Sequence, residues 1–275
     1  GASDEVMKAM VEKIKAKKEF GQNFLKDSSI LDKIIQSMPH NNNHIVEIGP
    51  GLGDLTKNLV KYKDVTAYEV DTDLIGILKS KFANEIESKK FTLKHIDVLR
   101  AWDELKFLHD GKYDLIANLP YYIATNIILR AFEDELCEHI IVMVQKEVAQ
   151  KFTAKVNDKE YSSLGIMTEL ISKESKILFD VPPTAFDPMP KVTSSVLYIK
   201  KDLSKKIDKD LNKFLKACFV QPRKKLSKNL GSLLEKSKIL ALYEELDLND
   251  NLRPHEVSSS LYSQMHTKVK NGRDK

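Results

Sequence analysis

The sequence is poor in cysteine and has no long run of apolar residues. Its 2 cysteines, Cys137 and Cys218, lie far apart in apolar surroundings, so we expect both to be reduced core residues. The longest apolar runs, such as residues 140–144, fall far short of the roughly 20 residues that span a bilayer. The first residues also lack the charged start and apolar core of a secretion signal. We therefore expect a cytoplasmic protein without a membrane segment.

Signatures of several enzyme and ligand classes are missing as well. No Gly-Lys-Ser/Thr triplet follows the glycine-rich turn at 49–53, which excludes a P-loop, and no G-x-S-x-G motif marks a serine hydrolase. His40 and His44 have a spacing that can bind metal on a helix. Pro39 and three asparagines predict a loop there instead, and no further ligand is near. We expect no metal site.

The charged residues are unevenly distributed along the 275 residues. Residues 1–200 carry a net charge of −3 and residues 201–275 carry +7, within a total of +4. This asymmetry favours a polyanionic partner for the C-terminal part, although lysine-rich surfaces also serve solubility. With 42% apolar residues the chain can bury a sizeable core, either in one large domain or in a large and a small one.

Hydrophobic periodicity predicts alternating helices and strands through most of the chain. Residues 28–38 have apolar side chains at helical spacing, with Pro39 just beyond the expected end. Strands are expected at 44–49, 65–70, 91–97, 113–119 and 139–145, and again at 177–181 and 195–200. Helices are expected at 54–62 with Asp54 as the cap, at 72–82, and at about 124–133, 146–155 and 161–172.

The strand candidates are apolar throughout rather than alternating, which is typical of a parallel sheet covered on both faces. The class is therefore a doubly wound α/β domain, and the last two strands are expected to complete its far edge in antiparallel direction. Beyond the lysine- and aspartate-rich stretch 200–210 only helical patterns follow. We expect a lysine-rich basic arm at 1–27 (Lys13, Lys15, Lys17, Lys18), an α/β domain at 28–202 and a small all-helical domain at 203–275.

A glycine-rich loop follows the first strand of the expected sheet. VEIGPGLGDLT (46–56) places Gly49, Gly51 and Gly53 where the backbone must turn and where α/β sheets bind ligands. Asp54 occupies the position at which a dinucleotide fingerprint needs its last glycine, so a pyrophosphate would meet a carboxylate. A tight turn without a ligand is the simplest alternative for such a loop.

Carboxylates at the ends of these strands favour a ligand with ribose hydroxyls and a positive charge. Glu47 precedes the glycines, Glu69 ends the second strand and could accept from both hydroxyls of a ribose, and Asp97 ends the third strand beside the expected adenine position. S-adenosylmethionine has both features. The combination predicts a binding site for this cofactor.

The loop Asn118-Leu119-Pro120-Tyr121 after the fourth strand contains no acid, base, thiol or metal ligand. Methyl transfer to an exocyclic amine does not need one, because the sulfonium is already a good leaving group and the protein must mainly align the attack. Asn118 and a neighbouring carbonyl would accept from the two amine hydrogens of adenine, and Tyr121 would stack on a base flipped out of its helix. A proline turn with rim tyrosines is the alternative for the motif alone.

Seven segments in this order and spacing resemble the KsgA/RsmA-type 16S rRNA adenine dimethyltransferases. The resemblance covers residues 17 to about 230 and is carried by KKEFGQNFL (17–25), VEIGPGLGDLT (46–56), AYEVD (67–71), HIDVL (95–99), ANLPYYI (117–123), VQKEVAQKF (144–152) and VPPTAFDPMPKVTSSVL (181–197). It implies a Rossmann-like class I methyltransferase sheet with a helical C-terminal domain. It also implies dimethylation of two adjacent adenosines in a hairpin near the 3′ end of 16S rRNA, within an assembling small subunit, by a monomer.

The resemblance also implies roles for individual residues. Asn118 and the Leu119 carbonyl would hold the target amine, and Tyr121 and Phe186 would sandwich the adenine. The residues implied to contact S-adenosylmethionine are Asn23, Leu25, Gly49, Gly51, Glu69, Asp97 and Asn118. The segment 220–231 resembles the basic helix that opens the C-terminal domain, and its implied rRNA contacts are Arg223, Lys224, Lys225 and Lys228. A solvated basic helix face explains these four cations equally well.

Erm-type 23S rRNA methyltransferases share the fold and are the nearest alternative. Those enzymes typically have alanine and lysine where Pro50 and Leu52 stand, and isoleucine at the Leu119 position. They also have a glutamate-tyrosine pair near Lys146-Glu147, so this chain has the dimethyltransferase version at each place. Tyr122 departs from the pattern, because the family often has asparagine there. A non-catalytic ribosome-assembly factor remains a further alternative, which the intact Asn118 loop disfavours.

Overall fold

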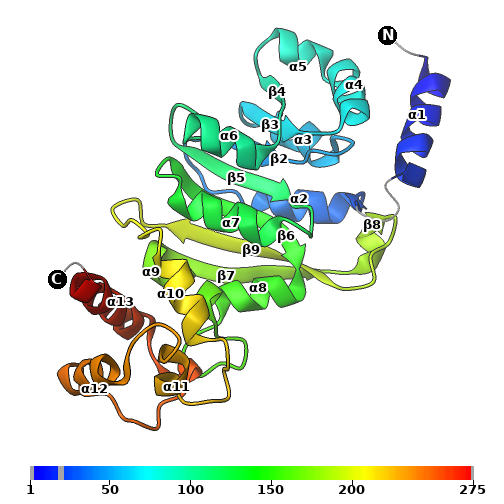
Figure 1. Ribbon diagram of the computed structural model, residues 1–275. Helices are drawn as coiled ribbons and strands as arrows, with labels where there is room; N and C mark the ends of the chain where they lie inside the picture. The colour runs from blue at the N-terminus through cyan, green and yellow to red at the C-terminus, as the bar shows by residue number, and fades with distance from the viewer. Residues whose placement is uncertain (1–2, 18–21, 274–275) are drawn as a thin grey trace. The chain divides into compact units, whose positions relative to one another are not determined.

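The protein is described from a computed structural model that covers residues 3–17 and 22–273 (Figure 1). Lys18 and residues 19–21 of the first motif lie outside the described residues. The chain forms two compact units, one made of residues up to Ala149 with Lys176–Leu203 and the other of Gln150–Ser175 with the residues from Ser204 onward. The chain changes from one unit to the other after residues 149, 175 and 203, and the expected boundary at 202/203 lies beside the third of these points. The expectation that residues 150–175 belong to the α/β domain differs from this division.

The first unit is built on a seven-stranded sheet with the order β4-β3-β2-β5-β6-β9-β7. Its neighbours from β4 to β6 pair in parallel, and β9 pairs with β6 in antiparallel direction, as the sequence predicts. The strands are β2 (His44–Ile48), β3 (Val65–Glu69), β4 (Phe91–His95), β5 (Tyr113–Asn118), β6 (Cys137–Gln145), β7 (Ser172–Val181) and β9 (Ser194–Lys201).

Helices cover both faces of this sheet, because its strands bury successive side chains on opposite sides. Ile116 on β5 and Ile141 on β6 belong to one large apolar cluster, which also includes residues of the helices α2 and α3. Leu115 and Val142 are also fully buried but lie outside that cluster. Helices α6 and α7 pack together on the near face in Figure 1. The helices of this part are α1 (Asp4–Lys17), α2 (Ser28–Gln36), α3 (Asp54–Leu59), α4 (Thr72–Lys81), α5 (Ala83–Glu87), α6 (Val98–Leu105) and α7 (Ala124–Glu133), and α8 (Lys146–Thr153) begins here and ends in the second unit.

Three helices of the first unit are each preceded by an aspartate in the extended conformation, which caps the helix. Asp27, Asp71 and Asp97 each accept hydrogen bonds from backbone N–H groups in the first turn of α2, α4 and α6. The expected cap of α3 is wrong, because Asp54 is its first helical residue and Gly53 precedes it with φ +85°. Lys26 binds the Asp54 carboxylate at 2.9 Å instead.

A small two-stranded ribbon joins the N-terminal segment to a segment late in the first unit. Strand β1 (Phe24–Leu25) pairs in antiparallel direction with β8 (Phe186–Asp187), which follows the short 3₁₀ helix η1 (Pro183–Ala185). Leu25 and Phe186 both join the main apolar cluster. Residues separated by more than 150 positions in the chain therefore lie side by side.

The second unit is helical. Tyr161 ties its early segment to the C-terminal part, because its hydroxyl donates to the Val257 carbonyl at 2.9 Å and its ring packs against Phe219. Helix α9 packs against α10 and α13, which explains why residues 150–175 belong here. The helices are α9 (Ser163–Ile171), α10 (Leu211–Cys218), α11 (Leu226–Leu230), α12 (Lys236–Glu245), the 3₁₀ helix η2 (Pro254–Glu256) and α13 (Ser259–Arg273).

Both cysteines are buried and free, as expected. Burial raises the pKa of the Cys137 and Cys218 thiols to about 12, so both stay protonated at neutral pH. Within the described ranges, no helix has both the length and the apolar character needed to cross a membrane.

Candidate active site

The glycine loop between β2 and α3 needs its glycines for two physical reasons. Gly49 and Gly51 have φ of +65° and +59°, a region that L side chains rarely adopt. A Cβ on Gly51 would also lie 2.9 Å from the Phe24 ring. The N-terminal segment therefore lies directly against the loop.

Glu69 is a buried acceptor at the end of β3. Its carboxylate accepts from the backbone N–H of Gly51 at 3.4 Å and from those of Val70 and Asp71 at 2.9 and 3.1 Å. Burial raises the pKa of Glu69, while these three hydrogen bonds act in the opposite direction. A carboxylate has about four lone-pair positions, so about one position remains to accept from a ligand hydroxyl.

Glu69 and Asp97 line one pocket, which we call the Glu69 pocket. Asp97 reaches it from the start of α6, where one of its oxygens accepts from the Leu99 N–H at 2.8 Å. Tyr68, Ile96 and Val98 supply apolar walls. Gly49 forms part of its lining as well. The pocket thus combines the carboxylate residues Glu69, Asp71 and Asp97 with apolar surface.

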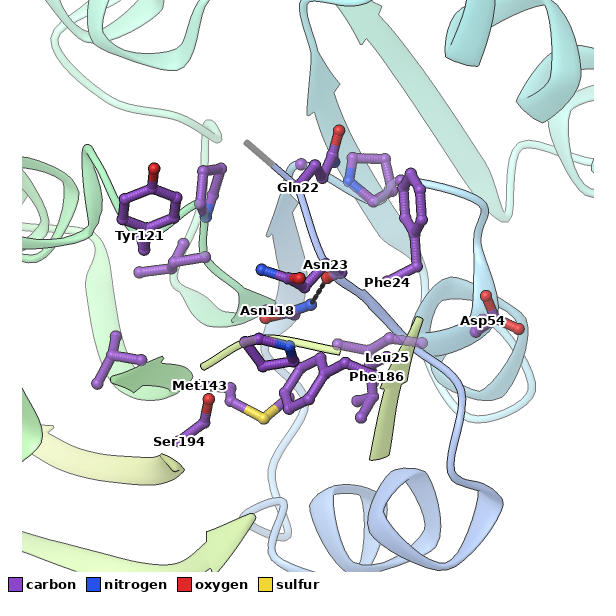
Figure 2. A pocket seen from close by; sticks show the side chains of 18 of the residues that line it. Gln22, Asn23, Phe24, Leu25, Asp54, Asn118, Tyr121, Met143, Phe186 and Ser194 are labelled. Atoms are coloured by element: carbon purple, nitrogen blue, oxygen red, sulfur yellow. Dashed lines mark hydrogen bonds between the residues drawn. The ribbon is translucent and has the colours of Figure 1, made fainter. Parts of the chain in front are cut away.

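A second pocket, which we call the Asn118 pocket, adjoins it through the shared residues Gln22, Gly49 and Pro120. It is drawn in Figure 2. All the remaining residues expected to contact the cofactor or the target adenine line it, from four different parts of the first unit: Asn23, Leu25, Gly51, Asn118, Leu119, Tyr121 and Phe186. The sequence motifs therefore converge on two neighbouring pockets.

The Asn118 side chain is held in one orientation. Its Nδ2 donates to the Asn23 backbone carbonyl at 3.2 Å, the dashed line in Figure 2, so its Oδ1 remains an acceptor for another group. The Leu119 N–H donates to the Met143 carbonyl at 3.2 Å, which holds the next residue of the loop on β6. The end of β5 thus presents an oriented amide oxygen.

Two aromatic side chains of the Asn118 pocket differ in exposure. Tyr121 is 51% exposed, whereas Phe186 is 6% exposed and is held by the β1–β8 ribbon. Both side chains line the same pocket (Figure 2). An exposed ring and a buried ring offer a flat ligand one movable and one rigid face.

Glu47, which the sequence places among the carboxylates that favour a positively charged ligand, lines the Asn118 pocket, although the resemblance does not imply it as a cofactor contact. It is 2% exposed and accepts a hydrogen bond from the Thr56 hydroxyl. Burial raises the pKa of Glu47 to about 8, and the negative charges of Glu69 and Asp54 act in the same direction. A carboxyl group in this position favours a nearby positive charge. The sequence signal for this role is the position of Glu47 just before the glycine-rich loop.

The comparisons with known proteins agree with this geometry. Residues 13–270 match the profile of the family described as ribosomal RNA adenine dimethylase. The chain belongs to this family. The Ribosomal RNA small subunit methyltransferase A of Aliarcobacter butzleri is 82% identical over 265 residues, covering 96% of this chain and 100% of that protein. The protein of the same name from Campylobacter jejuni strain RM1221 is 49% identical over 260 residues, covering 94% and 96%.

Solved structures support the same fold for this member of the dimethylase family. A dimethyladenosine transferase from Plasmodium falciparum superposes with a TM-score of 0.75 at 24% identity, covering 90% of this chain and 98% of that one. The 23S rRNA methyltransferase ErmE gives a TM-score of 0.65 at 20% identity, covering 90% and 100%. At these identities the structures establish the fold, and the Rossmann-like sheet with a helical C-terminal region is confirmed.

The four cations expected to contact rRNA lie in the second unit, and the expected helix is mostly a turn. Arg223 and Lys224 are in the turn, Lys225 precedes α11, and Lys228 lies on that short helix; all four are exposed. Asn229 explains the difference, because its side chain hydrogen-bonds both backbone groups of Gln221 and the Lys225 carbonyl. These bonds hold the basic segment in a turn.

Proposed function

We propose that this member of the family transfers methyl groups from S-adenosylmethionine to the N6 atoms of two adjacent adenosines in a hairpin near the 3′ end of 16S rRNA. The proposal rests on family membership and on one observation above all, the Asn118 amide whose oxygen is oriented in a pocket with Tyr121 and Phe186. The 82% identical relative is named for the small ribosomal subunit, which favours 16S rRNA over 23S rRNA as the target.

The residues of the two pockets fit S-adenosylmethionine. In the Glu69 pocket, Glu69 would accept from a ribose hydroxyl and Asp97 from the amine of the cofactor's adenine, between apolar walls. Gly49 and Gly51 would let the backbone approach the ligand, and Asn23 and Leu25 would contact it from the N-terminal segment. Glu47 supplies a carboxyl group that a positive ligand stabilises in its charged form. When bound, the cofactor supplies an activated methyl group on a sulfonium.

The chain's own residues prepare the acceptor. Adenine N6 is a poor nucleophile because its lone pair is delocalised into the ring. The Asn118 Oδ1 and the Leu119 carbonyl would accept hydrogen bonds from the two N6 hydrogens and so favour a pyramidal nitrogen with a directed lone pair. Tyr121 and Phe186 would hold the flipped base between them. The alkylated nitrogen is strongly acidic and loses its proton without a dedicated base.

We further propose that the protein acts as a monomer in the cytoplasm on an assembling small subunit. Arg223, Lys224, Lys225 and Lys228 would bind rRNA phosphates, which position the RNA without reading its sequence. No metal takes part in the proposed reaction, since the sulfonium provides the driving force.

A methylation assay tests the substrate. Small ribosomal subunits that lack the modification should accept labelled methyl groups from S-adenosylmethionine in the presence of the purified protein. Large-subunit rRNA should stay unlabelled. Label in 23S rRNA would select the Erm-type activity instead, and no label in either RNA, despite cofactor binding, would support a non-catalytic assembly factor.

Asn118→Ala tests the role of the amide. This variant should keep most of its affinity for S-adenosylmethionine, because Glu69 and Asp97 remain, but lose methyl transfer by roughly 100-fold or more. Calorimetric titration and the single-turnover transfer rate measure the two effects separately. Asn84→Ala, an exposed asparagine on α5, serves as the control and should behave like the wild type. Near wild-type transfer by Asn118→Ala would show that the amide oxygen does not hold the amine.

A further inference from the structure

Tyr122 is the residue of the Asn118 loop to which the proposed function assigns no role. The structure places it at the Glu69 pocket, together with Asp97 and Val98, and away from the lining of the Asn118 pocket. Successive residues after Pro120 therefore serve different pockets, Tyr121 the Asn118 pocket and Tyr122 the Glu69 pocket.

The exposure of Tyr122 is high for an aromatic side chain at a pocket. Its relative exposure is 65%, and Val70, which lines the same pocket, is 54% exposed. Apolar surface of this kind gains free energy when a ligand removes it from water. A flat aromatic ligand that lies between these two side chains would cover both of them.

The orientation of the Tyr122 ring is supported from one side. Its ring meets the Tyr121 ring edge to face, with 6.0 Å between centroids and 84° between planes. Pro120 lines the pocket just before it and limits the shape of the loop. A ring at this place can form a wall for a ligand whose polar groups reach Glu69 and Asp97.

We propose that Tyr122 is a binding residue for the adenosine half of S-adenosylmethionine, where it forms one wall of the Glu69 pocket. The inference rests on the proposed function, because it requires that this cofactor occupies the pocket. The aromatic ring supplies the contact surface for the ligand. The phenol hydroxyl is not needed for it.

Titration calorimetry with two ligands tests the assignment. S-adenosylhomocysteine probes the whole site, and 5′-methylthioadenosine probes the adenosine half without the amino-acid end. Tyr122→Ala should weaken the binding of both ligands by the same factor of roughly ten, the size expected when one stacking interaction is removed. Tyr122→Phe should bind both ligands like the wild type, and Tyr122→Asn should resemble Tyr122→Ala.

Tyr62→Ala provides the matched control, since Tyr62 is 66% exposed and lines neither pocket. It should leave both affinities unchanged, and the melting temperature of each variant reports whether its fold is intact. Wild-type affinity for both ligands in Tyr122→Ala would overturn the role of Tyr122 alone. Absence of S-adenosylhomocysteine and S-adenosylmethionine binding by the wild type would overturn the proposed function together with it.

Discussion

At the scale of single residues, the candidate site depends on where polar groups are held and not on an acid-base pair. The amide of Asn118 is oriented by the Asn23 carbonyl, and the Glu69 carboxylate is oriented by three backbone N–H groups. Each is fixed by backbone atoms, which a change of neighbouring side chains does not remove. Such preorganisation is the main contribution that an enzyme can make to catalysis when the substrate already carries a good leaving group.

Glu47 gives a prediction about pH at this scale. Its pKa in the folded protein is about 8, against 4.5 for an ordinary glutamate, so the folded state holds a proton that the unfolded chain releases. The stabilising contribution of this raised pKa is fully present below about pH 4.5 and is lost as the pH rises toward 8. Glu47→Gln does not titrate. The ligand-free variant should therefore gain stability over the wild type as the pH rises, by roughly a few kcal/mol at about pH 8.5.

Denaturant unfolding at about pH 5 and about pH 8.5 measures this difference, because this range covers most of the interval between the unfolded pKa of 4.5 and the folded pKa of about 8. Glu87→Gln at the exposed end of α5 is the control and should show the same small difference at both pH values. If the stability difference between Glu47→Gln and the wild type does not change with pH, the Glu47 carboxyl does not have the raised pKa.

At the scale of elements, much of the sheet is predictable because its strands are short apolar runs bounded by turn residues. The parallel strands, the antiparallel β9 and the helices between them follow from those runs. The start of α3 is not predictable in the same way, since Gly53 and Asp54 are both acceptable at a helix N-terminus. The fold of 220–231 depends on the Asn229 side chain bonding to Gln221, a tertiary contact that the basic pattern does not reveal.

The same limit applies to the site. Its motifs and their order predict Asn118, Glu69 and Asp97 as site residues, because strand ends of a parallel sheet meet at one edge. The hydrogen-bond partner of the Asn118 side chain is the backbone carbonyl of Asn23, however. The direction of a backbone carbonyl cannot be predicted from the sequence. The division of Tyr121 and Tyr122 between two pockets likewise depends on the path of the loop after Pro120.

The glycine loop gives a prediction at this scale. Gly51→Ala should destabilise the protein by roughly 1–2 kcal/mol, since its φ is +59° and its Cβ would collide with the Phe24 ring. Because Phe24 and the N-terminal segment would shift, the affinity for S-adenosylhomocysteine should fall as well. Thermal unfolding and calorimetry measure both effects.

Gly76→Ala is a matched control for that experiment. Gly76 lies within α4, and a Cβ added there meets nothing within 4 Å. This variant should gain roughly 0.5–1 kcal/mol from the better helix propensity of alanine and should bind S-adenosylhomocysteine like the wild type. Equal effects of the two substitutions would mean that the loop conformation at Gly51 is not required.

At the scale of the whole molecule, the two units differ in net charge and in their proposed binding roles. All residues that line the Glu69 and Asn118 pockets belong to the first unit. The excess positive charge lies beyond residue 200, where the net charge is +7. Cofactor binding and phosphate binding are therefore expected to be separable by substitution.

Replacing the four exposed cations of the basic segment with glutamine tests this separation. Affinity for unmodified small subunits should fall, and the slope of log affinity against log salt should become less steep by roughly one for each phosphate that the variant no longer neutralises. The affinity for S-adenosylhomocysteine should stay unchanged.

A second variant removes the same charge from exposed lysines of the first unit, namely Lys57, Lys61, Lys79 and Lys89. The proposed role of the basic segment requires that this control keeps a steeper salt dependence than the first variant, because equal slopes would mean that net charge alone attracts the RNA.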